Sequence, residues 1–344
     1  MIKLLFLSLA AFSTLGAHDA LAIHLVAQQA SRSGGYEAYH QRFLSQSQRL
    51  LTECSNSDAG RKLREQNALR RADKLKELRR LDAASVLATS HKTNLTDVSV
   101  STYPEYLFGD DDSVKCVLAP ETTQRMFYVK GELYRQDIAE DQIGVSLSTE
   151  LQFIDISTCT PVSNLWIDFW HSNAAGVYSG VIGSDAGESA EVSNVNATFL
   201  RGLVQTDSYG LAGFTSIFPG HHEGRAPHID IVATYGGTFQ NNNTYAGGSI
   251  VHAGELFFDQ DLITQVEATS SYASNTQNLT LNDVDKGLQE AAASGYDPIV
   301  EYALLGDSVE DGVFAWISIG IDLTATNNET AAGARTADGG VQYR

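Results

Sequence analysis

A short segment of the chain concentrates groups that can bind a metal ion. Residues 218–230 read Phe-Pro-Gly-His-His-Glu-Gly-Arg-Ala-Pro-His-Ile-Asp and hold three of the nine histidines. Side chains two apart in a strand project from the same face, so His228 and Asp230 can bind one ion together. His222 precedes them across a Gly-Arg-Ala-Pro turn and can close on the same ion. Two imidazoles and one carboxylate suit iron, manganese or zinc, although the spacing equally allows an exposed polar turn with a hydrogen-bonded pair.

Short predicted strands surround this segment and must position it. Beyond Cys116, seven apolar runs are separated by clusters of glycine, asparagine and aspartate. They cover residues 145–156, 165–171, 199–206, 214–218, 229–235, 250–258 and 312–323. The run at 165–171 is apolar on both faces, as expected of a strand that is covered on both sides. Seven such strands over roughly 200 residues predict a mainly β fold, a β-sandwich.

A helical region precedes the strands. Residues 36–81 contain no proline, and apolar residues recur at helical spacing, which predicts two amphipathic helices broken near residues 55–58. Residues 41–80 hold 11 Lys and Arg against 5 Asp and Glu. We interpret the basic run 61–80 as a solvated helix face rather than as a site for an anionic partner. The apolar stripes of these helices need a partner surface, which suggests a homodimer through the N-terminal helices.

The composition excludes two classes of protein. The 344 residues include 42 Asp and Glu against 23 Lys and Arg, for a formal net charge of -19. Nucleic acid is not expected as a partner, because counterion release needs clustered cations. A hydrophobic fraction of 43% excludes a disordered chain and allows a substantial core.

The first 22 residues have the layout of a secretory signal peptide. Lys3 is followed by an apolar stretch from Leu4 to Leu15 and then by small residues, with cleavage expected after Ala17 or Ala22. No later run reaches the ~18 apolar residues that a membrane span needs, so no membrane partner is expected. Five N-x-[ST] sequons agree with a secreted, extracellular glycoprotein: Asn94, Asn196, Asn242, Asn278 and Asn328.

The cysteines and the changes in composition give a provisional division of the chain. Cys54, Cys116 and Cys159 permit one disulfide in an oxidising compartment, with any of three pairings. We divide the chain into four parts: a signal peptide 1–22, a helical region and linker 23–100, a β-sandwich domain 101–323 and a disordered tail 324–344. The tail is predicted to be disordered because it offers little to bury.

Several recognisable motifs follow one another in a fixed order. They include Cys-Val-Leu-Ala-Pro-Glu-Thr-Thr from 116, Trp-Ile-Asp-Phe-Trp-His-Ser-Asn-Ala-Ala-Gly-Val-Tyr-Ser-Gly from 166, Phe-Leu-Arg-Gly from 199, Phe-Pro-Gly from 218 and Gly-Glu-Leu-Phe-Phe-Asp from 254. Over residues 45–322 this order resembles the secreted, fungal-type branch of the intradiol ring-cleavage dioxygenases. The resemblance implies a β-sandwich holding a mononuclear ferric ion, which activates a catechol for insertion of O2 between its two hydroxyl-bearing carbons.

The resemblance also implies a set of metal ligands. The family uses two tyrosines and two histidines; Tyr178 matches the first tyrosine and His228 the first histidine, whereas His222 stands at the second tyrosine and Asp230 at the second histidine. The exchange keeps two anionic oxygens and two imidazoles, which favours a retained metal site. The implied metal is Fe(III), with Fe(II), Mn or Zn as alternatives.

Catalytic roles follow from the same resemblance. Arg225 is retained and can stabilise charge that develops on the ring, and His222 can act as a base. Glu255 stands where the family has glutamine and can pair with Arg225. The implied partners are O2 and a small aromatic substrate, and the acidic surface favours a neutral catechol over a carboxylated one. Two alternatives stay open: a diverged metalloprotein with other chemistry on phenolics, and a non-catalytic binding protein of the same fold.

Overall fold

The computed structural model describes residues 45–79, 127–183, 192–293 and 298–343. The chain divides into two compact units, Met1–Gln46 and Ser47–Arg344, and nearly all the described residues belong to the second. The predicted signal peptide and residues 80–126, which include Asn94 and Cys116, lie outside the described residues. Within them, no helix is long and apolar enough to cross a membrane.

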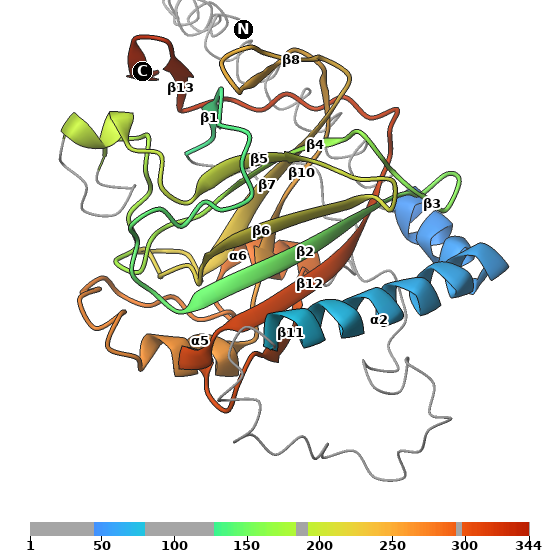
Figure 1. The fold of residues 1–344 in the computed structure, drawn as a ribbon, viewed down its shortest axis with the longest axis horizontal. Coiled ribbons are helices and arrows are strands. Elements are labelled where there is room, and N and C mark those ends of the chain that lie inside the picture. Colours follow the sequence, from blue (N-terminus) through green and yellow to red (C-terminus); the bar gives the residue numbers. More distant parts are fainter. Residues whose placement is uncertain (1–44, 80–126, 184–191, 294–297, 344) are drawn as a thin grey trace, which may run out of the picture. The chain divides into compact units, whose positions relative to one another are not determined.

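Two sheets form the body of the second unit (Figure 1). The first has the order β11 (Glu301–Leu304), β12 (Val313–Ile321), β2 (Ser146–Asp155) and β3 (Thr160–Pro161), with β6 (Leu211–Ile217) also paired to β2. The second has the order β10 (Ser249–Phe257), β7 (His228–Tyr235), β4 (Trp166–Trp170) and β5 (Arg201–Gln205), and all its pairs are antiparallel. Each of the seven predicted strands overlaps one of these strands, which confirms the mainly β fold.

The hydrophobic core joins the inner faces of the two sheets. Ile167 and Phe169 of β4 belong to the same buried cluster as Leu151 and Phe153 of β2. Because side chains alternate along a strand, Trp170 projects from the outer face of the second sheet. All five residues of β4 are buried, so this outer face is covered as well, as the sequence predicts.

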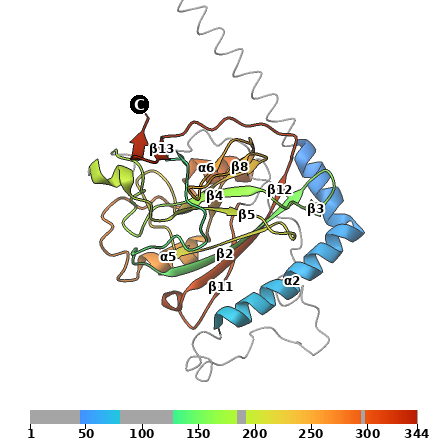
Figure 2. The same ribbon diagram turned by 45° about the horizontal axis from the view of Figure 1, so that its top comes forward.

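Helix α2 (Asp58–Arg79) packs on the outer face of the first sheet (Figures 1 and 2). Its Arg70 and Arg71 contact Glu150 of β2, with N–O distances of 2.9 and 3.5 Å. The amide of Asn67 exchanges hydrogen bonds with that of Gln152, the next outward residue on β2. The prediction of a solvated basic face is therefore wrong for these two arginines, because both contact a carboxylate on the sheet. The helix lies within the same compact unit as the sheets rather than in a separate region.

A disulfide links the first helix of this region to the first sheet. Residues 45–56 are helical and end at a bend at Ser57, close to the predicted break. Cys54 is bonded to Cys159, in the turn that follows β2, with 5.3 Å between their Cα atoms. Cys54 and Leu63 pack against Ile154. The sheet thus covers part of the apolar stripe of the helices, which was the reason to expect a homodimer. The homodimer itself stays a prediction.

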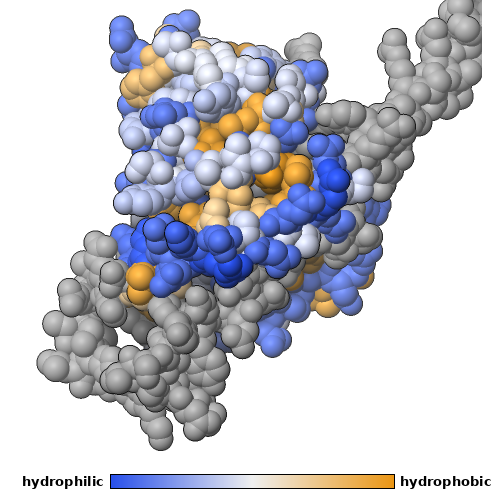
Figure 3. Space-filling view, turned by 90° about the vertical axis from the view of Figure 1, so that its right-hand side faces the viewer, coloured by the Kyte–Doolittle hydropathy of each residue, from blue (hydrophilic) through white to orange (hydrophobic). Residues whose placement is uncertain are grey.

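Figure 3 shows this side of the molecule, where strongly hydrophilic residues form a band next to a hydrophobic patch.

The C-terminal tail contains regular structure. β13 (Gly333–Thr336) and β14 (Gly339–Gln342) form a hairpin, and β13 pairs in parallel with β1 (Val129–Lys130). The predicted disorder of residues 324–344 is therefore wrong for this stretch. Sequence composition did not reveal it because the pairing partner of β13 lies about 200 residues earlier in the chain, and such non-local pairing has no local signal.

Several smaller elements surround the two sheets, among them the short 3-10 helices η2 (Val192–Asn196) and η3 (Val309–Asp311). α5 (Gln260–Glu267) buries Leu262, Ile263 and Val266 against the core. α6 (Lys286–Ala293) lies near the end of β10, where Leu288 contacts Phe257. β8 (Thr238–Phe239) and β9 (Tyr245–Ala246) form a hairpin after β7.

Candidate metal centre

The register of the second sheet aligns three charged residues and a tryptophan in one row on its outer face. Glu255 of β10 lies opposite Asp230 of β7, which lies opposite Trp170 of β4, which lies opposite Arg201 of β5. Directly opposite residues share a face, and His228, two residues before Asp230, projects from the same side. The candidate centre therefore lies on the outer face of a sheet and not between the two sheets.

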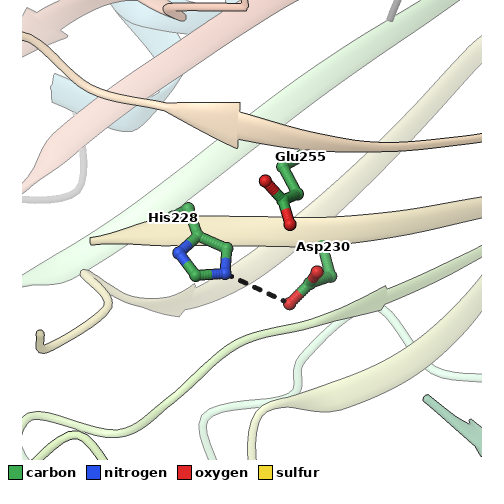
Figure 4. Close-up of side chains that lie close together, drawn as sticks. All are labelled: His228, Asp230 and Glu255. Carbon is green, nitrogen blue, oxygen red and sulfur yellow. Dashed lines mark ion pairs between the residues drawn. The ribbon is translucent and has the colours of Figure 1, made fainter. Parts of the chain in front are cut away.

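Three of these side chains converge (Figure 4). The ligand atoms of His228, Asp230 and Glu255 all lie within 4.8 Å of one another, and all three residues are buried. His228 Nε2 lies 3.6 Å from Asp230 Oδ2. Like charges directly opposite each other destabilise a sheet, and the effect is stronger when they are buried, so two facing carboxylates favour a bound cation or proton.

The ring of His228 is oriented for metal binding. Its Nδ1 lies 2.7 Å from the carbonyl oxygen of Ala226 and donates its proton there. The lone pair then remains on Nε2, which faces the cluster, and this is the arrangement usual for histidine ligands. The phenol oxygen of Tyr178 lies 3.5 Å from this Nε2.

Tyr178 reaches the cluster from a tight turn. Gly176 has a φ of 76°, and a Cβ there would collide with the carbonyl oxygen of His221. Only glycine therefore allows this turn to lie so close to the backbone of His221. The ring of Tyr178 packs 4.5 Å from that of Phe127 and 5.4 Å from that of His222, between centroids. Burial, followed by the negative charge of Asp230, raises the pKa of Tyr178 well above its usual value, so only a strong local cation can ionise it.

His222 lies beside the cluster but is not part of its tightest group. Its ring centroid is 5.6 Å from that of His228, and the residue is buried. Burial, together with the charges of His228 and Arg225, lowers the pKa of His222 to about 3, so its imidazole is neutral. Of the four ligands that the sequence implies, the structure gathers Tyr178, His228 and Asp230 around one point and places His222 next to them. Glu255, which was predicted as catalytic rather than as a ligand, joins the group.

Arg225 is enclosed by two carboxylates. Its Nη1 and Nη2 donate to the two oxygens of Glu255 at 3.0 and 2.5 Å, and its Nε donates to Asp285 at 3.0 Å. The predicted pairing of Glu255 with Arg225 is confirmed. Burial alone would raise the pKa of Glu255, but the charges of His228 and Arg225 hold it below its usual value.

Asp285 is the functional residue that the sequence reasoning missed. It precedes α6 and accepts a hydrogen bond from the backbone N–H of Leu288, which is the contact of a helix N-cap. An aspartate three residues before a leucine in an amphipathic segment does predict such a cap, but it does not predict the contact with Arg225, 60 residues away.

The residues present fit a resident metal. Arg225 pairs with two buried carboxylates, Glu255 and Asp285, while a third, Asp230, faces Glu255 and lies beside His228, so carboxylates gather at this point. Buried charge is costly unless it is paired or coordinates a metal. A phenol, carboxylates and an imidazole are donors that suit iron.

Other histidines have structural partners. His171 is fully buried, and its ring nitrogens lie 2.8 Å from the carbonyl oxygen of Ser172 and 2.7 Å from Ser216 Oγ, as in a structural role. His221 is buried and bonds to Glu267, because α5 closes over it.

Comparisons with known proteins place the fold. No protein-family model and no curated protein matches the chain. An intradiol ring-cleavage dioxygenase from Tetranychus urticae is similar in structure, with 25% identity, a TM-score of 0.50 and coverage of 62% of this chain and 98% of that one. A second dioxygenase structure has 24% identity with the same TM-score and coverage. A hydroxyquinol 1,2-dioxygenase from Pseudomonas putida has 15% identity and a TM-score of 0.37, over 83% of this chain and 99% of that one. The β-sandwich of this chain is therefore similar to that of intradiol ring-cleavage dioxygenases, which supports an enzyme of that general class.

Proposed function

We propose that the protein is an intradiol ring-cleavage dioxygenase that binds Fe(III) and acts on catechol-type aromatics. The observation that carries this proposal is the buried cluster of Tyr178, His228, Asp230 and Glu255 on the outer face of a sheet in a dioxygenase-like sandwich. When bound, ferric iron draws electron density from a catechol so that both atoms of O2 enter the product and the bond between the hydroxyl-bearing carbons breaks.

The proposed ligands are Tyr178, His222, His228 and Asp230. Tyr178 and Asp230 supply anionic oxygens, and His228 supplies the lone pair of Nε2, fixed by its hydrogen bond to Ala226. Glu255 lies in the same group, yet both of its oxygens accept hydrogen bonds from Arg225. We therefore assign Glu255 to balancing the charge of the metal, and His222 to the fourth ligand position.

Arg225 has a different role from the one that the resemblance implies. Its guanidinium is held by Glu255 and Asp285 and shares its positive charge with both carboxylates. Arg225 thus positions Glu255 at the centre and offers little attraction for a carboxylate on the substrate. This arrangement supports a neutral catechol as the substrate, in agreement with the acidic composition of the chain.

Secretion is part of the same proposal. It is supported by residues 1–22, by the disulfide between Cys54 and Cys159, and by the exposure of the four sequons that the structure describes. Those sequons are Asn196, Asn242, Asn278 and Asn328. N-terminal sequencing of the protein from the medium of expressing cells tests this point, and an uncleaved intracellular chain would contradict it.

Catechol turnover tests the activity. The Fe(III)-loaded protein is expected to consume O2 with catechol and to yield a ring-opened dicarboxylic acid, and its absorption spectrum is expected to shift when catechol is added without O2. Asp230→Ala should abolish both effects, whereas Asp283→Ala, an exposed aspartate, should change neither. A wild-type protein that binds Fe(III) but consumes no O2 with any catechol would contradict the enzymatic proposal.

A second candidate function is a diverged metalloprotein with other chemistry on phenolics. The presence of Glu255 in the cluster favours it, because a set rich in carboxylates also suits Mn or Zn. Metal analysis of the protein as purified distinguishes the two: iron supports the dioxygenase, whereas zinc or manganese supports the second candidate.

A further inference from the structure

A second buried arginine lies beside the candidate centre. Arg201 is 1% exposed and stands at the end of the row that runs through Trp170 to Asp230. Its Nε donates to the carbonyl oxygen of Ser179 at 2.9 Å and to Ser179 Oγ at 3.1 Å. Ser179 directly follows Tyr178, so Arg201 holds the backbone of the turn that carries the tyrosine.

The Tyr178 turn is fixed by two side chains from outside it. Asn194 Nδ2 donates to the carbonyl oxygens of Tyr178 and Val181, at 2.7 and 2.6 Å. Arg201 binds the carbonyl oxygen between them. Carbonyl groups of this turn are therefore satisfied by an amide and a guanidinium rather than by a sheet ladder, so the position of Tyr178 depends on them.

The charge of Arg201 is less neutralised than that of Arg225. Its nearest carboxylate, Glu132, lies 3.8 Å from Nη1, and within the described residues neither Nη1 nor Nη2 makes a hydrogen bond. Along the row, Trp170 of β4 stands between Arg201 and Asp230, so the guanidinium belongs to the second strand from Asp230. A guanidinium buried with so few partners costs stability, which is reasonable where its position serves a site.

We propose that Arg201 is a positioning residue for the metal centre: it fixes the Tyr178–Ser179 turn from β5, and it places a buried positive charge in the row that leads to Asp230. The part of this inference that concerns the metal rests on the proposed function. The part that concerns the turn stands on the hydrogen bonds alone.

The test compares the buried Arg201 with the partly buried Arg71 on the opposite face of the sandwich. Arg201→Met removes the donor and the charge, and Arg71→Met is the matched control, because Arg71 also pairs with a glutamate against a sheet. Hydrogen exchange of the peptide spanning residues 176–182 is measured in the metal-free proteins. Fe(III) affinity is measured by competition with a chelator, and the phenolate-to-iron band by absorption.

The expected result differs between the two variants. Arg201→Met should speed exchange of the 176–182 peptide at least about tenfold, weaken Fe(III) binding by about 10–100-fold and shift the band. Arg71→Met should lower the midpoint of thermal unfolding and leave exchange of this peptide, Fe(III) affinity and the band unchanged. If Arg201→Met does not fold, Arg201→Lys, which keeps the charge but loses the Nε donor, should show the same faster exchange.

Two outcomes would overturn the inference. One is exchange of the 176–182 peptide at the wild-type rate in the folded Arg201 variant. The other is a loss of Fe(III) affinity that is equal in the Arg201 and Arg71 variants. A wild-type protein that binds no Fe(III), but whose turn loosens in the Arg201 variant, would instead count against the proposed function and leave the positioning of Tyr178 established.

Discussion

The two outer faces of the sandwich bury charge in different ways. On the first sheet, Glu150 receives Arg70 and Arg71 from α2, Glu301 of β11 also attracts Arg71, and the neighbouring amides of Asn67 and Gln152 bond to each other. At the second sheet, the buried carboxylates of Asp230, Glu255 and Asp285 stand against the guanidinium groups of Arg201 and Arg225. The charges of the first face are therefore balanced by the chain itself, as expected of structural packing. At the centre on the second face these carboxylates outnumber the guanidinium groups, which favours an additional cation, as expected of a binding site.

Loss of a ligand is the largest effect that this comparison predicts. His228→Gln should weaken metal binding by more than the ~10–100-fold that is typical of changes around a ligand, because it removes a donor. His171→Gln is the control, since His171 is a buried histidine close to the same sheet, but its partners are Ser172 and Ser216. Chelator competition should show wild-type affinity in the His171 variant. Equal losses in both variants would mean that the cluster is not a metal site.

Removal of the disulfide should affect the first face and spare the second. Replacing Cys54 and Cys159 together with serine opens a link between residues 105 apart and should lower the free energy of unfolding by about 4 kcal/mol. Metal affinity should stay at the wild-type value, because neither cysteine contacts the centre. Chemical denaturation and chelator competition measure the two quantities. A fall in metal affinity would show that the two faces are coupled.

A smaller effect is expected from the carboxylate that anchors α2. Glu150→Gln leaves Arg70 and Arg71 without their charged partner and should lower the free energy of unfolding by about 1–3 kcal/mol. Glu65→Gln, an exposed residue on the same helix, should change it by less than about 0.5 kcal/mol. Similar unfolding midpoints for the two variants would mean that the contact of Glu150 with Arg70 and Arg71 does not stabilise the first face.

The smallest effect is the most specific to the second face. In the metal-free protein, Asp230→Asn removes one of two facing charges and should raise the free energy of unfolding by up to about 1 kcal/mol. In the presence of the metal, the same change should destabilise the protein relative to wild type. Thermal unfolding with and without metal measures the change in stability of the variant in each state. If Asp230→Asn is less stable than wild type without metal, the idea of an excess of negative charge at this site is contradicted.

The sequence predicted local features better than contacts between distant segments. The spacing of His228 and Asp230 in a strand was enough to place them on one face, and the resemblance to the dioxygenase family implied Tyr178 as a third donor. The approach of Glu255 depends on the register between β7 and β10, and that of Asp285 on a loop 60 residues away. Neither has a local pattern, because register is set by tertiary packing.

The errors have the same origin. The tail hairpin depends on β1, and the docking of Arg71 depends on Glu150. In both cases the composition of the segment suggested exposure, and a partner far along the chain provided burial. Predictions from composition are therefore weakest where a polar segment contacts another segment that lies far away in the sequence.

Elemental analysis combined with an absorption spectrum tests the central claim most directly. The purified protein and a Tyr178→Phe variant are compared after loading with Fe(III). We expect stoichiometric iron and a visible phenolate-to-iron band in the wild type, and loss of that band in the variant. A colourless wild type that holds zinc or no metal, or a band unchanged in Tyr178→Phe, would contradict that claim.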